Sequence, residues 1–180
     1  MNAAAQDGVL LHLGRDSPAL HMPVGDQDVI AEPAFEDYTD MFFDLCDAVG
    51  LDVKDGCNIY PMNASLGGNA IATVQDGNRI IVYDRTLSRE IGYGGAMMVI
   101  AHELGHHYCH HLETSADPMK ELAADRFAGA AMRLSKMSLD ATLGAVHILA
   151  ERPSKSYPGR ADRIKAITEG WNDPAAGRKC

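Results

Sequence analysis

The feature that most constrains this chain is the stretch VIAHELGHHYCHH at residues 99–111, which places five histidines and a glutamate within thirteen residues. Its pattern predicts a helix over about 96–112. On a helix, residues four apart lie on one face with Cβ atoms about 5–6 Å apart, so His102 and His106 can direct two imidazoles at one metal ion. Glu103 shares this side and is placed to hold a metal-bound water. The His-Glu-x-x-His spacing therefore predicts a zinc site with a base beside it.

The other three histidines of the stretch do not share that geometry. His107 is rotated by about 100° from His106, and His111 also lies off the ligand face. His110 lies on the correct face, but the helix rises by about 12 Å between His102 and His110, so one ion cannot reach both. We therefore expect His107, His110 and His111 to be surface groups or to support the ligands indirectly.

A catalytic zinc site usually has three protein ligands and an open position. One extended motif supplies a third histidine six residues after the second, following a glycine, but Leu112 and Cys109 occupy these positions here. A glutamate from a following helix is the alternative, and Glu121 lies fifteen residues past His106, just after Pro118. A loop of this length can lay the second helix beside the first. We expect Glu121 to be the third ligand.

Two further acidic residues bear on this site. Asp125, four residues after Glu121, shares its helix face and could accept the second ring N–H of a zinc-bound histidine, which would fix the tautomer of the ring. Glu113 is the rival third ligand, but it continues the first helix or its end and points away from the site. Glu121 is therefore preferred over Glu113.

The remaining pattern predicts an α+β domain with a small antiparallel or mixed sheet and helices after it. Proline and glycine punctuate residues 1–33, where we expect loops with room for a short strand. Strands are expected at 57–62, 69–75 and 79–84, and Asp76-Gly77-Asn78 predicts a hairpin between the last two. Helices are expected at 34–49, 96–112, 119–134, 138–150 and 161–171.

Length and charge limit the organisation and the function classes. A chain of 180 residues suits one compact domain. Within it, residues 1–50 form an N-terminal segment with one helix, which could be regulatory or a pro-segment, and residues 51–180 form the zinc-binding part. The formal net charge of −9 argues against binding to a nucleic-acid backbone, which needs clustered Lys and Arg.

Compartment and thiol chemistry can also be predicted. The N-terminus has no cationic and apolar leader, and no apolar run is long enough to span a bilayer, so we expect a cytoplasmic protein without membrane insertion. The cysteines, Cys46, Cys57, Cys109 and Cys180, show no Cys-x-x-Cys spacing. Free thiols in a reducing compartment are the simplest expectation. A Cys46–Cys57 bridge is the less favoured alternative.

Four pieces of sequence carry a family resemblance: NAIA at 69–72, AHELGHH at 101–107, ELAADRFAG at 121–129 and SYPGRADRIKAI at 156–167. With them the chain resembles the gluzincin zinc metallopeptidases, and among these the family of the HtpX heat-shock proteases, the CAAX prenyl endopeptidases and their soluble relatives. The resemblance covers roughly residues 55–170. It implies a zincin-like fold with one Zn²⁺ held by His102, His106 and Glu121. It also implies that Glu103 is the base and that Asp125 supports a zinc-bound histidine without binding the metal itself.

The chain departs from this family at two points. The C-terminal motif of the family typically reads Ser or Thr, His, Pro and then Arg-Ile, whereas this chain has Ser156-Tyr157-Pro158 before Arg163-Ile164. Tyr157 can still donate a hydrogen bond to a developing oxyanion, and Arg163 can support the same site. The alternatives are a tyrosine packed under its loop and a cation on a helix surface. The transmembrane helices of the family have no counterpart here, so membrane and prenylated substrates are not expected.

The expected activity is hydrolysis of a peptide or protein substrate. Zinc would lower the pKa of its bound water, and Glu103 would take the proton and pass it to the leaving amine. The segment NAIATVQ would form the upper rim of the cleft and pair with an extended substrate. The alternative is a non-catalytic or latent zinc- or peptide-binding protein (a sensor, an immunity factor or a pseudoprotease), with the N-terminal segment or the tail ending in Cys180 over the cleft. The intact Glu103 speaks against a non-catalytic site.

Overall fold

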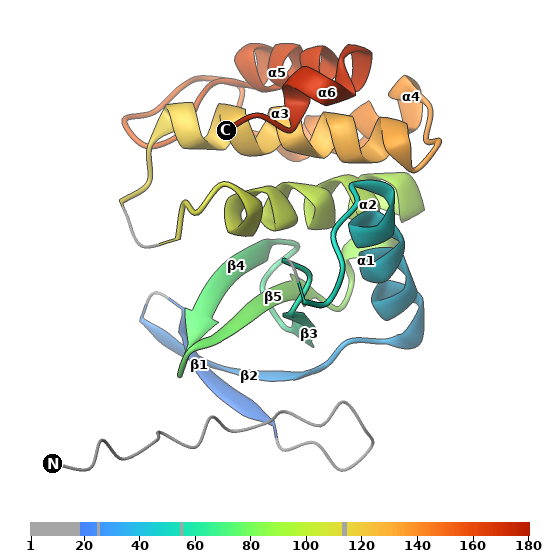
Figure 1. Ribbon diagram of the computed structural model, residues 1–180. Coiled ribbons are helices and arrows are strands. Elements are labelled where there is room, and N and C mark those ends of the chain that lie inside the picture. The colour runs from blue at the N-terminus through green and yellow to red at the C-terminus, as the bar shows by residue number, and fades with distance from the viewer. Residues whose placement is uncertain (1–18, 25, 55, 113–114) are drawn as a thin grey trace, which may run out of the picture.

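The computed structural model describes residues 19–24, 26–54, 56–112 and 115–180. Within them, five strands form one mixed sheet in the order β1-β2-β3-β5-β4 (Figure 1). Neighbouring strands are antiparallel except for β3 and β5, which run parallel. The strands are β1 (Leu20–Val24), β2 (Gln27–Pro33), β3 (Ile59–Ala64), β4 (Ala70–Gln75) and β5 (Asn78–Asp84).

Helices are stacked on one side of this sheet. In Figure 1, α2 lies over the sheet with α1 beside it, α3 lies over α2, and α5 and α6 lie over α3. The domain is therefore α+β, as the sequence predicted. The helices are α1 (Glu36–Ala48), α2 (Leu87–Tyr108), α3 (Pro118–Leu134), α4 (Leu139–Thr142), the 3₁₀ helix η1 (Leu143–Ile148), α5 (Arg160–Asn172) and α6 (Pro174–Gly177).

The predicted hairpin is confirmed and leaves β4 at an edge of the sheet. Asp76 and Gly77 connect β4 to β5, and both have positive φ angles, 51° and 78°. Two such residues make the type I′ turn, whose twist matches that of the flanking strands. Only β5 pairs with β4 among the described strands, so no strand covers the outer edge of β4, although the Ala72 N–H on that edge donates to Glu103 and the Ala70 N–H to Asn69.

The helices match the sequence pattern, but two of those predicted differ in extent. α2 starts nine residues earlier than predicted and ends at Tyr108, not at about residue 112, and Gly92, with φ 73°, interrupts it near its beginning. The helix expected at 138–150 begins with Ser138 as N-cap, but it changes to 3₁₀ geometry after one turn. α3 starts as predicted, because the side chain of Asp117 accepts a hydrogen bond from the Met119 N–H and Pro118 occupies the first turn.

The N-terminal part contributes more regular structure than its prolines and glycines suggested. β1 and β2 form a hairpin where loops and one short strand were expected, and β2 continues the sheet by pairing with β3. Met22, Val29 and Ala31 turn their side chains inward from this hairpin. Strand pairing therefore overrides the local turn-forming composition here.

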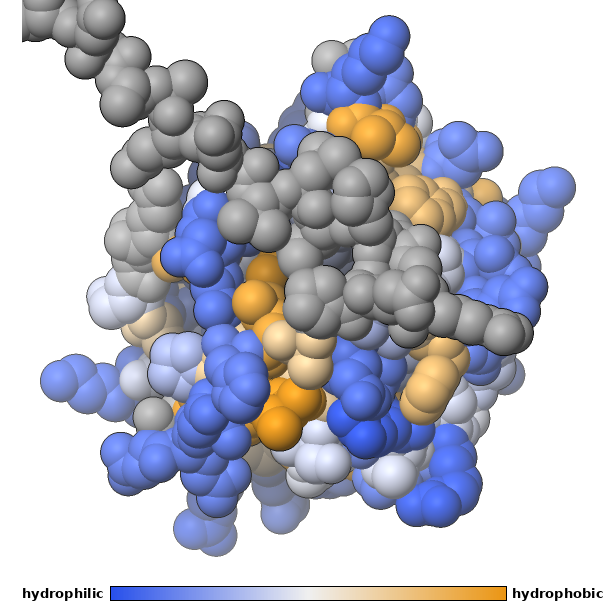
Figure 2. Space-filling model, turned by 90° about the horizontal axis from the view of Figure 1, so that it is seen from below, coloured by the Kyte–Doolittle hydropathy of each residue, from blue (hydrophilic) through white to orange (hydrophobic). Residues whose placement is uncertain are grey.

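Two apolar clusters lie on the two faces of the sheet. The larger one fills the space between sheet and helices and includes Phe42, Tyr83, Leu104 and Phe127. The smaller one lies on the opposite face, under the curled β1–β2 hairpin. Figure 2 views the molecule from this side and shows hydrophobic side chains gathered near its centre with hydrophilic ones around them. The members of the smaller cluster are Met22, Val29, Ala31, Met62, Ala64, Ile80 and Val82.

Helices α3 and α5 approach each other through glycine. A Cβ added to Gly129 would overlap the backbone carbonyl oxygen of Ile167. Gly129→Ala should therefore force the two helices apart and lower the free energy of unfolding by about 3 kcal/mol. Gly144→Ala is the matched control, because its added Cβ meets no atom within 4 Å. Urea unfolding of both variants tests this, and equal stability would contradict the close approach.

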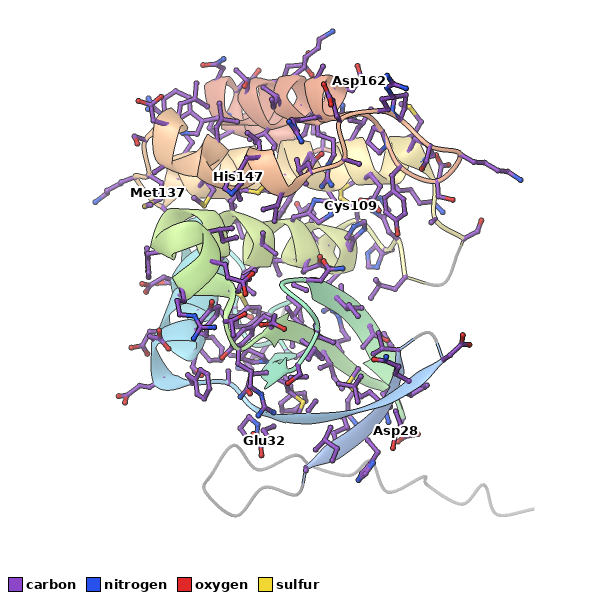
Figure 3. All side chains as sticks on the ribbon, turned by 180° about the vertical axis from the view of Figure 1, so that it is seen from behind. Asp28, Glu32, Cys109, Met137, His147 and Asp162 are labelled. Carbon is purple, nitrogen blue, oxygen red and sulfur yellow. A yellow bond between two sulfur atoms is a disulfide. The ribbon has the colours of Figure 1, made fainter. Side chains whose placement is uncertain are left out.

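The expectation of free thiols is wrong. Cys46 pairs with Cys57, with Cα atoms 6.1 Å apart, and Cys109 pairs with Cys180, with Cα atoms 5.5 Å apart. The first pair joins α1 to the segment before β3. The second pair joins Cys109, which directly follows α2 and is labelled in Figure 3, to Cys180. Disulfides persist in oxidising environments, so the thiol argument for a reducing compartment no longer holds.

Within the residues that the structure describes, no helix combines the length and apolar character needed to cross a bilayer.

Candidate metal centre

Two helices bring the three predicted ligands together. His102 and His106 lie on α2, and Glu121 lies in the first turn of α3. Their ligand atoms all fall within 4.8 Å of one another, and all three side chains are largely removed from solvent. The two Nε2 atoms are 3.0 Å apart, and each lies 3.4 Å from a different carboxylate oxygen of Glu121. This group could hold a metal ion.

These separations fit one small cation. In a tetrahedral site the distance between ligand atoms is about 1.6 times the bond length, so bonds of about 2.0–2.1 Å require ligand atoms about 3.3–3.4 Å apart. The Nε2 atoms, 3.0 Å apart, and the Glu121 oxygen nearest to each of them, at 3.4 Å, are separated by distances of this size. All three side chains line a cleft.

A glycine allows α3 to come close enough to α2 to supply the third ligand. A Cβ on Gly105 would lie only 3.1 Å from both the Cα and the carbonyl oxygen of Ala124. Gly105 precedes His106, and Ala124 is one turn after Glu121. The same close contact that packs the helices therefore sets the separation between the histidines and the glutamate.

Asp125 and Arg163 hold His102 from behind, as the sequence predicted for Asp125. The Asp125 carboxylate, which has no solvent exposure, lies 2.9 Å from His102 Nδ1. Arg163 donates to both of its oxygens, from Nε at 2.7 Å and from a terminal nitrogen at 2.8 Å. An ionised carboxylate can only accept, so His102 Nδ1 carries a proton, and its Nε2 is left to face Glu121 and His106.

The contacts among the three residues shift the pKa values of the two histidines in opposite directions. Burial alone lowers the pKa of His102, but its hydrogen bonds to Asp125 and Glu121 outweigh this and raise the pKa to about 10. Burial and the neighbouring His102 charge lower the pKa of His106 to about 3. In the metal-free protein a proton on His102 therefore stands in for the positive charge, and metal binding would displace it.

Glu103 lies beside the ligands without belonging to them. Its Oε2 accepts a hydrogen bond of 2.7 Å from the backbone N–H of Ala72, on the free edge of β4. Burial raises the pKa of Glu103 to about 7, against the opposing effect of the His102 charge. A carboxylate whose pKa lies near neutrality can both take up and release a proton.

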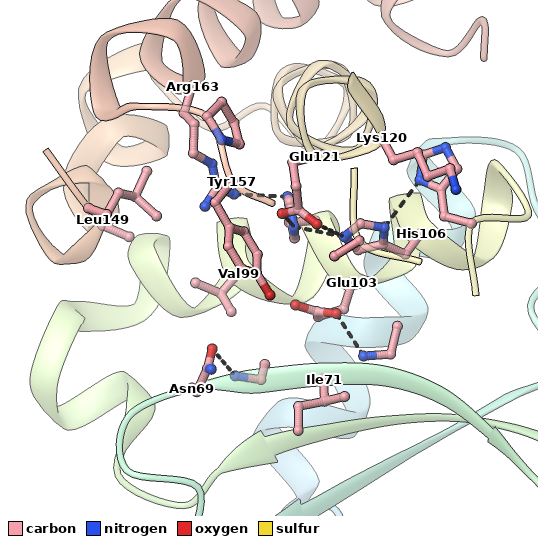
Figure 4. Close-up of a pocket in the computed structure, with 18 of the residues that line it drawn as sticks. Asn69, Ile71, Val99, Glu103, His106, Lys120, Glu121, Leu149, Tyr157 and Arg163 are labelled. Atoms are coloured by element: carbon pink, nitrogen blue, oxygen red, sulfur yellow. Dashed lines mark hydrogen bonds and ion pairs between the residues drawn. The ribbon is translucent and has the colours of Figure 1, made fainter. Parts of the chain in front are cut away.

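A cleft of about 630 Å³ opens over these residues. β4 forms one wall, α2 the floor, and the segment before α5 the opposite wall. In Figure 4, Tyr157 extends from that segment into the cleft, towards the level of Glu103 and Val99. Tyr157 is 51% exposed, so it is not packed under its loop. Arg163 is not a surface cation either, because it is bound to Asp125.

No protein-family model, curated protein or solved structure matches this chain. The function has to be inferred from the geometry of the cleft and its residues.

The other three histidines of the stretch at 99–111 lie in three different environments. His107 was expected on the surface or behind a ligand, but it is 2% exposed, and its ring lies between the Ile80 carbonyl oxygen at 2.9 Å and Arg79 Nε at 3.4 Å. His107 follows Leu104 by three residues and therefore shares the buried face of α2; this spacing could have indicated its burial from the sequence. His110 is exposed, whereas His111 lies against His106. Glu113, the rival ligand, lies outside the described residues.

Proposed function

We propose that this protein is a zinc-dependent metalloendopeptidase of the gluzincin type. The single observation that carries the proposal is the convergence of His102, His106 and Glu121 with Glu103 beside them, at the floor of an open cleft. A zinc-binding group without enzymatic function would not require a buried carboxylate next to the open position. The order of sheet, two-histidine helix and glutamate helix also agrees with the zincin-like arrangement that the sequence resemblance implies.

The donor set favours zinc. Two imidazoles and one carboxylate with an open fourth position form a common catalytic zinc site, whereas Mg²⁺ and Ca²⁺ prefer oxygen ligands alone. When bound, zinc supplies a Lewis acid that polarises a scissile carbonyl and makes water more acidic. His102 and His106 present neutral nitrogens to it, and Glu121 supplies the negative charge.

Glu103 is the proton carrier in this proposal. It takes the proton from the attacking water and delivers it to the leaving amine. The Ala72 N–H fixes one of its oxygens, so the other is directed to the reacting atoms. This contact also links the base to the strand along which a substrate would lie.

The substrate class follows from the edge of β4. An extended peptide can add to a free strand edge through main-chain hydrogen bonds, which gives affinity with little dependence on side chains. Away from β4, the cleft is lined in part by apolar residues of α2, of η1 and of the segment before α5, which can accept a hydrophobic side chain next to the scissile bond. The apolar residues that line it are Val99, Val146, Ile148, Leu149 and Pro158.

Tyr157 is placed to stabilise the oxyanion that forms when water attacks the carbonyl. Tyr157→Phe, which removes only the hydroxyl, should lower kcat by about 10²-fold because one donor to the developing charge is lost. KM and zinc content should stay near the wild-type values. Steady-state cleavage of a quenched fluorescent peptide measures both constants. An unchanged kcat would remove Tyr157 from the mechanism.

Metal analysis and a cleavage assay on the same purified sample test the proposed function. We expect about one zinc per chain, cleavage of unfolded casein or a quenched peptide, loss of cleavage on chelation and its return with added zinc. Zinc without cleavage of any peptide in a diverse pool would overturn the peptidase proposal and favour a zinc- or peptide-binding protein. A protein without zinc affinity would overturn the metal site itself.

A further inference from the structure

Every metal-binding imidazole has a second ring nitrogen that needs a partner. Such partners fix the tautomer and the orientation of the ring, and losing one typically costs 10- to 100-fold in metal affinity. His102 has Asp125 for this purpose. For His106, no contact of Nδ1 with a carboxylate is seen among the described residues; this atom lies 3.2 Å from Nδ1 of His111, as the dashed line beside His106 in Figure 4 marks. We infer that His111 is a positioning residue that holds His106 ready to bind zinc through its Nε2 atom.

This inference rests on the zinc site of the proposed function, although not on peptidase activity. When Nε2 of a neutral His106 faces the metal, the one ring proton must sit on Nδ1. Nδ1 then donates to His111, whose own Nδ1 must be unprotonated and whose proton must sit on Nε2. The two rings are inclined at 69° with centroids 5.3 Å apart, so the contact is edge-on and not a stack.

The end of α2 explains how a residue five positions further along the chain reaches His106. The N–H of His111 donates to the carbonyl of His106 at 3.0 Å, and the N–H of His110 donates to that of His107 at 3.4 Å. This pair of bonds is the Schellman motif, which requires a left-handed residue after the helix. His110 supplies it with φ 56°. The chain therefore turns back, and the ring of His111 is laid against that of His106.

The turn does not depend on the His111 side chain. Its two hydrogen bonds come from the backbone, and Cys109, within the same turn, is covalently joined to Cys180. Replacing the His111 ring should therefore remove the acceptor for His106 and leave the turn in place. This makes the contribution of the ring measurable by itself.

Zinc affinity of purified, metal-free protein provides the test, measured by competition with a chromogenic chelator. His111→Ala should weaken zinc binding by about 10- to 100-fold. His111→Asn should restore most of the affinity, because the amide oxygen of Asn occupies nearly the position of Nδ1 and can accept the same hydrogen bond. His21→Ala is the control for losing an imidazole elsewhere, since His21 lies exposed on β1 and pairs with Asp28. The melting temperatures of the metal-free variants should equal that of the wild type.

The outcomes separate this inference from the proposed function. Wild-type affinity in His111→Ala would overturn it, and so would an Asn variant as weak as the Ala variant. Tight zinc binding by a wild type that cleaves no peptide would overturn the peptidase proposal alone. A wild type that binds no zinc would overturn both.

Discussion

Glu103→Gln is expected to retain one zinc per chain and to lose peptide hydrolysis by about 10³- to 10⁴-fold. The amide cannot take a proton from water, but it has the shape of the carboxylate, and its oxygen can still accept the hydrogen bond from the Ala72 N–H. Glu103 is not one of the three proposed zinc ligands, so the substitution leaves all three in place. Metal analysis and single-turnover cleavage on the same preparation measure the two properties separately.

Glu151→Gln is the matched control, because Glu151 is exposed and the change in charge is the same. It should retain the full wild-type rate. If Glu103→Gln cleaved at a rate near the wild type after removal of contaminating proteases, Glu103 would not be the base. Loss of zinc together with activity would show instead that Glu103 stabilises the metal site.

The convergence of His102, His106 and Glu121 was predictable because it depends on short-range geometry. Helical periodicity alone places His102 and His106 on one face, and the reversal of the chain between α2 and α3 brings Glu121 opposite them. The role of Asp125 follows from the same face of α3. Each step uses local sequence and one helix–helix contact, which a hydrophobic pattern is sufficient to anticipate.

The features that were missed depend on geometry beyond one helix. The disulfide partner of Cys109 is 71 residues away and is brought close by the packing of the C-terminal helices. The β1–β2 hairpin packs against the apolar residues on one face of the sheet, and this packing stabilises it. The strand propensity of its own residues does not predict it. His111 was set aside because an ideal helix would carry it off the ligand face, whereas the real helix ends three residues before it.

Asp125→Asn is expected to have the second large effect, on stability and zinc affinity together. Burial alone would raise the pKa of Asp125, but hydrogen bonds from Arg163 and His102 lower it, so the carboxylate is ionised at neutral pH and the pair is intact there. The amide cannot neutralise Arg163, whose side chain is only 13% exposed. Leaving one buried charge unpaired typically costs about 3–5 kcal/mol. The melting temperature should fall by roughly 10 °C, and zinc affinity by about 10- to 100-fold.

A second substitution separates these two effects. Arg163→Met in the Asp125→Asn background removes the unpaired cation and keeps most of the side-chain volume. The double variant should therefore recover a large part of the lost melting temperature. Zinc affinity should stay low, because His102 still lacks the carboxylate that fixes its Nδ1 proton. Recovery of both properties would mean that Asp125 acts only by neutralising Arg163, and recovery of neither would mean that the Arg163 charge is not what destabilises the single variant.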